Sequence, residues 1–364
     1  MRKNEAVWVE SRQRWQIKVQ LDGTRRTFAD PTPGKKGKIA AERKADCWLA
    51  DNTIGENTKC GVLLDRYFDH VQATTSKSNW RPIGMHIEVH IRPVLGDKKI
   101  CRVTENTLQT VIDEAYAKGL SARMLRNIKS TLMAWMKFCR KEHVTTLHPE
   151  DITIPNGAKK STRSVADPKD IRTLFSSDKT TWRGEVCSDR YIHAYRLAVL
   201  IGLRPGELLG LRWSDVKKDK LTIRRSLNDF MEFTPGKNEN ARRDIMISGL
   251  VADEIEQQRE LLHKEGIISA YVFPRPNAEP TSQDTYRSYW KRYREHNKIK
   301  KLTPYEMRHT FVSVNKEMPE GLKKMVVGHS ADMDTEGVYG HEMEGDRKAA
   351  AAYSDAAFRK ILGK

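Results

Sequence analysis

Few cysteines and no long apolar run characterise this chain of 364 residues, and each shortage excludes a class of protein. The five cysteines, at positions 47, 60, 101, 139 and 187, lie far apart and form no Cys-x-x-Cys pair. This spacing argues against a disulfide framework or a zinc cluster and favours a reducing cytoplasm. The longest strongly apolar stretch, residues 197–203, is too short to cross a bilayer. The first five residues precede no apolar run, so we expect no secretory signal peptide.

Acidic residues are also scarce relative to basic ones. The chain has 65 Lys and Arg against 48 Asp and Glu, a formal net charge of +17. With 38% hydrophobic and 31% charged residues, the composition is that of a globular protein with a well-hydrated surface. The length predicts about two to three domains. The basic excess favours a nucleic acid as partner.

The first segment is the most basic, with twelve Lys or Arg against five Asp or Glu in residues 1–44. Apolar residues alternate with polar ones over residues 15–21, which predicts a half-buried strand. Asp22-Gly23 then predicts a hairpin turn before a return strand at 25–28. With a strand at 7–9, a loop at 34–37 and a helix at 39–50, we expect a three-stranded sheet with one helix.

Two interpretations of this small basic domain are open. It is either a passive domain or a sheet whose cations enter a DNA groove. We favour the second, with four candidate DNA-binding residues: Arg12, Lys18, Arg25 and Arg26.

The second segment, residues 57–155, is predicted to be helical. Apolar residues recur at helical spacing in 63–71 and again in 125–139. The polar side of the second stretch has almost no acidic residue. A charged helix face is usually only solvated, but this one favours contact with DNA phosphates. The candidate residues are Arg123, Arg126, Lys129 and Lys137.

Residues 156–164 are poor in apolar side chains and predict a linker, after which a third segment follows. A largely apolar helix ends at Arg204 and a second helix begins at Pro205, with Glu207 in its first turn. Strands at 221–227 and 244–247 flank a turn that contains Lys237. Further along come Tyr305-x-x-Arg308-His309-Thr310 and Gly328-His329-Ser330, and Tyr339 stands ten residues after His329. Each of these motifs is weak alone.

In this order the motifs resemble the tyrosine recombinase (phage integrase) family. The first arginine box of the family is matched by GLRPGELLGLRW around Arg204, and its hairpin lysine by Lys237 in TPGKNENARR. The second box, usually His-x-x-Arg, corresponds to Tyr305 and Arg308. The family's GHS motif contains His329 here, and its nucleophile falls on Tyr339. The RPVLGD stretch at 92–97 is similar to the family's core-binding domain.

The resemblance implies site-specific cutting and rejoining of DNA without metal, nucleotide or other cofactor. Tyr339 would attack a phosphodiester and form a 3′-phosphotyrosine, which stores the bond energy for rejoining. Arg204 and Arg308 would clamp the phosphate oxygens. Lys237 would protonate the leaving 5′-oxygen, and His329 would donate a hydrogen bond to the phosphate.

Tyr305 is a departure from the family pattern. A histidine can accept a proton at neutral pH, whereas a tyrosine, with an ordinary pKa of about 10, mostly cannot. We therefore expect Tyr305 to contact the phosphate or merely to pack, and His309, His329 or water to act as general base. Glu207 is expected to orient its neighbours.

The expected fold class is mainly α with small β-sheets. We expect an arm-site DNA-binding domain at 1–56, a helical core-binding domain at 57–155, a linker at 156–164 and a mixed α+β catalytic domain at 165–364. The alanine-rich helix at 347–362 would dock on a neighbouring subunit or, alternatively, fold back on its own domain.

The expected partners are double-stranded DNA, at core and arm attachment sites, and three further copies of the chain in a tetramer. An excision factor or a DNA-bending host protein would assist. We expect an enzyme of the bacterial cytoplasm, at the nucleoid when bound to DNA, that integrates or excises a prophage or conjugative transposon. The alternatives are a resident chromosome-resolving recombinase and a catalytically idle DNA-binding regulator. A type IB topoisomerase would have no use for the first segment.

Overall fold

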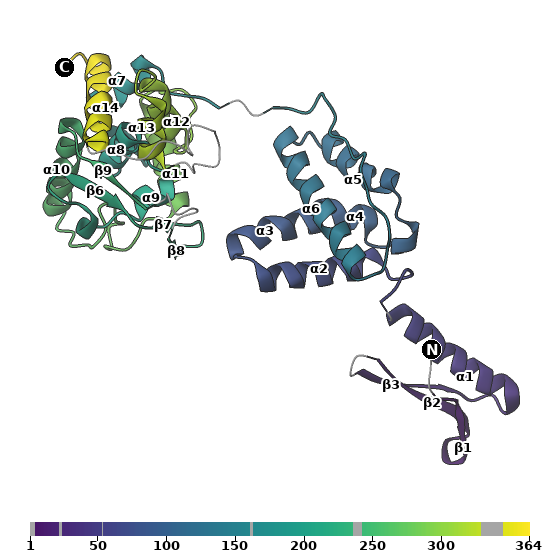
Figure 1. Ribbon diagram of the computed structural model, residues 1–364. Helices are drawn as coiled ribbons and strands as arrows, with labels where there is room; N and C mark the ends of the chain where they lie inside the picture. Colours follow the sequence, from purple (N-terminus) through teal and green to yellow (C-terminus); the bar gives the residue numbers. More distant parts are fainter. Residues whose placement is uncertain (1–3, 22–23, 53, 161–162, 236–241, 329–344) are drawn as a thin grey trace. The chain divides into compact units, whose positions relative to one another are not determined.

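The computed structural model describes residues 4–21, 24–52, 54–160, 163–235, 242–328 and 345–364 (Figure 1). The chain separates into two compact units, Met1–Ser161 and Thr162–Lys364. This boundary falls inside the predicted linker. Helices predominate in the described residues and their sheets are small and antiparallel, which confirms the predicted fold class. The division into three domains with separate roles stays a prediction.

The N-terminal part of unit 1 is a three-stranded sheet with a helix on one face. Its elements are β1 (Val7–Val9), β2 (Arg14–Leu21), β3 (Thr24–Asp30) and α1 (Gly34–Asn52), with a 3-10 turn at Glu10–Arg12. The β2–β3 register pairs Ile17 with Phe28 and Val19 with Arg26. Ile17 and Val19 are buried in one cluster with Ala41 and Ala45 of α1. The two apolar strand residues therefore face the helix, as their period-2 spacing predicts.

The loop predicted at 34–37 is instead the first turn of α1. Gly34 has a left-handed backbone (φ +77°), which lets the chain turn sharply out of β3. A Cβ at Gly37 would lie 1.7 Å from the Thr32 carbonyl oxygen and 2.9 Å from the Trp15 ring. The two glycines thus permit a tight strand-to-helix turn rather than a loop.

The rest of unit 1 is a helical cluster with its own core. Its elements are α2 (Cys60–Thr74), α3 (Lys77–His86), a π-helical turn (Ile87–Ile91), α4 (Arg92–Leu95), a 3-10 turn (Ile100–Arg102), α5 (Glu105–Ala117) and α6 (Ala122–Lys141). Leu125, Leu132, Trp135 and Cys139 of α6 are fully buried. They lie at the three- and four-residue spacing that predicted an amphipathic helix here.

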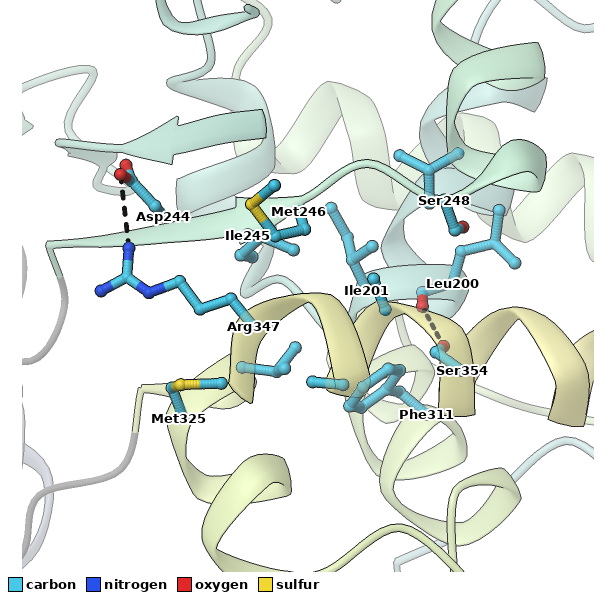
Figure 2. A pocket seen from close by; sticks show the side chains of 14 residues that line it. Leu200, Ile201, Asp244, Ile245, Met246, Ser248, Phe311, Met325, Arg347 and Ser354 are labelled. Carbon is cyan, nitrogen blue, oxygen red and sulfur yellow. Dashed lines mark hydrogen bonds and ion pairs between the residues drawn. The ribbon is translucent and has the colours of Figure 1, made fainter. Parts of the chain in front are cut away.

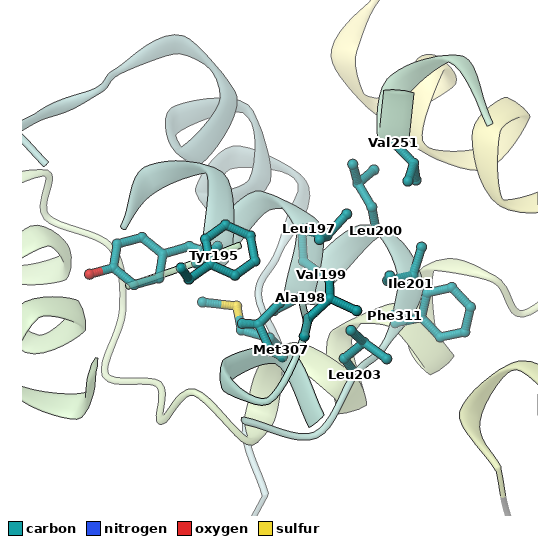
Figure 3. Packing of buried hydrophobic residues seen from close by; sticks show 14 of the residues in the cluster. Tyr195, Leu197, Ala198, Val199, Leu200, Ile201, Leu203, Val251, Met307 and Phe311 are labelled. Carbon is teal, nitrogen blue, oxygen red and sulfur yellow. The ribbon is translucent and has the colours of Figure 1, made fainter. Parts of the chain in front are cut away.

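Unit 2 is built around α8 (Ile192–Ile201), all of whose residues are buried. The preceding elements are α7 (Pro168–Ser176), β4 (Lys179–Trp182) and β5 (Glu185–Ser188). After it come α9 (Pro205–Leu209), a 3-10 turn (Trp213–Asp215), β6 (Lys220–Ile223), β7 (Ser226–Leu227), β8 (Phe233–Thr234), β9 (Arg243–Met246), α10 (Gly249–Lys264), α11 (Gln283–His296), α12 (Glu306–Val314), α13 (Glu320–Val327) and α14 (Asp346–Leu362). Figure 3 shows α8 side chains packed with Val251 of α10 and with Met307 and Phe311 of α12.

The strand predicted at 221–227 is divided into β6 and β7. Arg225, between the two, forms an ion pair with Asp215, which is 2% exposed. Its side chain is thereby turned toward the 3-10 turn, and β6 pairs with β9 while β7 pairs with β8.

In the single chain, α14 covers its own unit. Phe358 and Ala350 are buried in the unit 2 core, and the Ser354 hydroxyl donates to the Leu200 carbonyl oxygen at 3.0 Å. Figure 2 shows this contact and the ion pair of Arg347 with Asp244 of β9, at 3.3 Å. The apolar side of the helix packs within its own chain, as in the alternative that we left open, and docking on a neighbouring subunit stays a prediction.

Candidate active site

Arg204 owes its position to a tight turn after α8. Gly202 ends this helix with a left-handed backbone (φ +64°), and a Cβ there would lie 2.7 Å from the Phe311 ring. Only glycine fits this approach between α8 and α12. Leu203 is fully buried, and Arg204 follows as the N-cap residue of α9. The turn therefore places the first predicted arginine at the edge of the unit 2 core.

Glu207 holds Arg204 through both carboxylate oxygens. Arg204 Nη1 donates to Oε1 at 2.7 Å, and the Arg204 backbone N–H donates to Oε2 at 3.1 Å. Burial by itself would raise the pKa of Glu207, but the charges of Arg243 and Arg204 outweigh it and hold the pKa below its ordinary value. Glu207 is therefore ionised at neutral pH and orients Arg204.

The second predicted arginine, Arg308 on α12, lies in the same cluster and is only 2% exposed. Its Nη1 donates to the Gly202 carbonyl oxygen at 3.0 Å. Its Nη2 is buried and has no hydrogen-bond partner among the described residues. Burial, with the nearby charge of Arg204, lowers the pKa of Arg308 to about 10, so the guanidinium is still charged at pH 7. A buried charge with an unused donor is unfavourable until an anion binds it.

The structure adds a third arginine, Arg243 on β9, that we did not predict. Its Nη2 lies 3.0 Å from Glu207 Oε2, and its Nε donates to the Val326 carbonyl oxygen at 2.6 Å. Arg243 and Ile245 are two residues apart on β9 and are both buried. That period-2 relation to an apolar residue was the available signal that Arg243 faces inward.

Tyr305, which is exposed, and His309, which is half-buried, lie on α12 and the turn before it, close to Arg308 in the sequence. Tyr305 is 45% exposed and its ring meets the His309 ring edge-on, with the centroids 5.3 Å apart. Burial and the charge of Arg163 lower the pKa of His309, so the imidazole is neutral and able to accept a proton at pH 7. The helix begins at Glu306, and the Thr303 hydroxyl donates to the Glu306 carboxylate at 2.9 Å.

Lys237, His329 and Tyr339 lie outside the described residues. Their flanking elements are described: β8 and β9 on either side of Lys237, and α13 and α14 on either side of the other two. Gly328 caps α13 with a left-handed backbone, and its carbonyl oxygen accepts from Arg204 Nη2 at 3.4 Å. Gly328, the last described residue before His329, therefore lies beside Arg204.

The four predicted DNA-binding residues of the N-terminal sheet are all exposed, but they do not share one face. Lys18 pairs with Thr27 and Arg25 with Gln20, on the face away from α1. Arg26 pairs with Val19 on the helix side, where its guanidinium lies 5.6 Å from the centre of the Trp48 ring. Arg12 belongs to the 3-10 turn between β1 and β2.

On α6, three of the four candidates lie in one exposed row. Arg123, Arg126 and Lys137 are exposed, at helical spacing with Ser130 and Ala134 between them. Lys129 lies to the side, half-buried, and donates to the Ile152 carbonyl oxygen. Arg126 Nε also donates, to the Ala122 carbonyl oxygen of its own helix at 3.2 Å, but Arg126 stays exposed, whereas Lys129 is half-buried against residue Ile152.

Within the described ranges, no helix is long and apolar enough to span a membrane. No group of three or more His, Cys, Asp or Glu side chains there is arranged to hold a metal ion.

Comparisons with known proteins agree on one family. Residues 165–345 match the model of the phage integrase family. The ICEBs1 integrase of Bacillus subtilis is 23% identical over 282 residues, which cover 73% of this chain and 74% of that protein. The Tn1549 transposon integrase in complex with transposon right end DNA aligns with a TM-score of 0.63 at 18% identity, over 79% of this chain and 97% of that one. A lambda integrase tetramer bound to a Holliday junction aligns with a TM-score of 0.59 at 17% identity, over 93% and 96%. The two structural matches show the fold.

Proposed function

The chain belongs to the phage integrase family of tyrosine recombinases, the site-specific enzymes that integrate or excise mobile elements, and we propose how its residues divide this reaction. The observation that carries the proposal is the cluster of Arg204, Arg243 and Arg308 around one buried carboxylate, Glu207. Three guanidiniums against one carboxylate leave an excess of positive charge. A DNA phosphodiester supplies the missing anion.

Arg204 and Arg308 bind the two non-bridging oxygens of the scissile phosphate. The unused Nη2 of Arg308 is a donor available for one of them. As the nucleophile attacks, further negative charge develops on the non-bridging oxygens, and fixed guanidiniums stabilise this transition state more than the ground state. Neither arginine needs a metal ion to do this.

Tyr339 supplies the nucleophile. Its Oη forms a bond to phosphorus, and the bond from phosphorus to the 5′-oxygen breaks, which gives a 3′-phosphotyrosine and a free 5′-hydroxyl. Lys237 donates the proton that this hydroxyl receives, and His329 donates a hydrogen bond to the phosphate. Attack by the 5′-hydroxyl of another strand reverses the step. His309, whose pKa is lowered, is the described residue best suited to accept the Tyr339 proton.

Two surfaces of unit 1 bind the rest of the DNA. The sheet face with Lys18 and Arg25, together with Arg12, contacts arm-type sites. The α6 row of Arg123, Arg126 and Lys137 tracks the phosphates of the core site, since Ser130 and Ala134 leave room for the backbone between the cations. We assign lesser parts to Arg26, which lies on the helix side of the sheet against Trp48, and to Lys129, which is half-buried and bonded to the Ile152 carbonyl oxygen.

The chain acts as a tetramer on two duplexes, by analogy with the lambda integrase tetramer bound to a Holliday junction. An excision factor or a DNA-bending host protein assists, and the substrate locates the reaction at the nucleoid of a bacterial cytoplasm. Residues 1–56 bind the arm sites, residues 57–155 bind the core site, and residues 165–364 carry out the catalysis.

The direct test is covalent trapping on a nicked suicide duplex that carries the element's own junction. Wild type should give a covalent protein–DNA band on a denaturing gel, and Tyr339→Phe should give none while still binding the duplex. If wild type binds the duplex without forming a band, the chain is an idle DNA-binding protein.

The role of Lys237 has a separate test. A 5′-bridging sulfur leaves without protonation, so a duplex with this substitution should restore cleavage by Lys237→Ala but not by Tyr339→Phe. If the sulfur-containing duplex does not help Lys237→Ala, then Lys237 is not the general acid.

A further inference from the structure

Arg243 is a buried arginine of the cluster that no part of the proposed reaction uses. It is less exposed than Arg204 and more exposed than Arg308. Its side chain is 6% exposed, whereas that of Arg204 is 27% exposed. Its Nη1 and Nη2 both face Glu207, at 3.3 and 3.0 Å, and its Nε donates to the Val326 carbonyl oxygen. A guanidinium committed in this way is not directed at a substrate.

The contacts to Glu207 change what Arg204 can do. If Glu207 had Arg204 as its one partner, the pair would be electrically neutral and would attract a phosphate weakly. Glu207 Oε1 instead accepts from both Arg204 Nη1 and Arg243 Nη1, and Oε2 accepts from Arg243 Nη2 and the Arg204 backbone. Sharing the carboxylate leaves part of the Arg204 charge uncompensated and still fixes its orientation.

The contact with Val326 connects the cluster to the end of α13. Val326 lies two residues before Gly328, whose carbonyl oxygen accepts from Arg204. The last carbonyls of a helix carry partial negative charge, and here two arginines bind them. Arg243 therefore holds the helix end from which the chain continues to His329.

We propose that Arg243 is a positioning residue for the recombinase reaction: by taking a share of Glu207, it leaves part of the Arg204 charge uncompensated and keeps Arg204 oriented. This inference rests on the function proposed above. Arg243 does not touch the phosphate, and its effect reaches the substrate through Arg204. Its neighbour Asp244 points the other way, toward Arg347 of α14, so the two adjacent residues of β9 serve different parts of the unit (Figure 2).

The test compares Arg243→Met with a matched control, Arg196→Met. Arg196 is another buried arginine of unit 2, with a side chain 9% exposed that donates to the Leu174 carbonyl oxygen and lies 3.7 Å from Glu254. For each variant we would measure the thermal midpoint, the Kd for the core duplex and the single-turnover rate of covalent-complex formation at saturating DNA. We expect Arg243→Met to lower that rate by about 100-fold, with the Kd changed less than about threefold. Arg196→Met should lose thermal stability while keeping its rate.

A second variant separates positioning from a merely structural role. In the double variant Arg243→Met/Glu207→Gln, the carboxylate that would neutralise Arg204 is absent, so the rate should recover by about tenfold over Arg243→Met. If Arg243→Met behaves like Arg196→Met, or if adding Glu207→Gln lowers the rate further, the proposal is wrong.

A readout without DNA keeps this result independent of the proposed function. Inorganic phosphate should raise the thermal midpoint of wild type and of Arg196→Met, and Arg243→Met should lose most of that rise. If wild type forms no covalent complex, the proposed function fails, and the phosphate response alone then decides the role of Arg243. An equal phosphate response in all three proteins would overturn the proposal.

Discussion

The molecule has two basic regions that use the same residue type in opposite ways. In unit 2, Arg243 and Arg308 are buried around Glu207, where each contact is specific and each charge is costly. On the N-terminal sheet, Lys18 and Arg25 stand exposed on an open face. Water and salt screen the exposed charges, so each contributes little and the contributions nearly add. Buried charges are few and strongly coupled, and removing one changes the rest.

Replacing Arg308 should have the largest effect. Arg308→Lys keeps a positive charge but loses the second Nη, which is the donor assigned to the phosphate. We expect the rate of covalent-complex formation to fall by about 10² to 10³-fold, with DNA binding nearly unchanged. Arg287→Lys, at an exposed ion pair of the same unit, is the control and should keep its rate. An unchanged rate for Arg308→Lys would mean that charge alone is sufficient at this position.

Removing the shared carboxylate should have the next largest effect, on stability. Glu207→Gln leaves buried arginines without their counter-charge, and we expect it to lower the free energy of unfolding by about 3 kcal/mol at pH 7. The folded pKa of Glu207 lies below the ordinary 4.5, so its contribution is complete above that pH and is lost as the pH falls through the folded pKa.

Urea unfolding of both proteins between pH 7 and pH 3 measures this difference. The two stability curves should converge on the acid side. Curves that stay parallel throughout would show that Glu207 is not ionised in the folded protein.

The exposed residue Tyr305 should have a smaller effect. A hydrogen bond from its hydroxyl to the phosphate contributes about 1 kcal/mol, so Tyr305→Phe should slow cleavage about fivefold. Tyr305→His restores the group usual in the family and should keep or raise the rate. Single-turnover cleavage measures both variants. A Tyr305→Phe rate equal to wild type would leave Tyr305 as a packing residue against His309.

The smallest effects should come from the sheet, and they test the difference between its faces. Lys18→Ala and Arg25→Ala should each weaken binding to arm-site DNA a few-fold and reduce the slope of log K against log salt by about 1. Arg26→Ala removes a cation–π contact with Trp48 and should lower stability by about 0.5–1 kcal/mol with little change in that slope. Binding isotherms of each variant at several salt concentrations measure this slope. Equal slopes for all three variants would contradict the assignment of one face to DNA.

Local patterns were sufficient for much of the fold and for part of the site. Alternation over residues 15–21 predicted β2, and the three- and four-residue spacing in 125–139 predicted α6. The helix start at Pro205 was predicted, which places Arg204 directly before α9, but the preceding helix ends at Ile201 and not at Arg204. Each of these depends on neighbours within a few residues, so the sequence order alone contains the information.

Other features depended on contacts between distant residues. The predicted strand at 221–227 is divided at Arg225, which forms an ion pair with Asp215, and in the single chain α14 packs on its own unit through Phe358. The same is true of the two faces of the β2–β3 sheet. Alternation revealed which residues share a face, but the register with β3 was needed to assign Arg26 to the helix side.

The sequence by itself determined the family, the order of the chemical motifs and the residue types that the reaction needs, because these are properties of spacing along one chain. Only the tertiary structure decided that Arg243 joins Glu207 across 36 residues and that Arg308 meets Gly202 across 106. A buried charge must find its partner within a few ångströms, and which partner is near depends on how the whole unit packs.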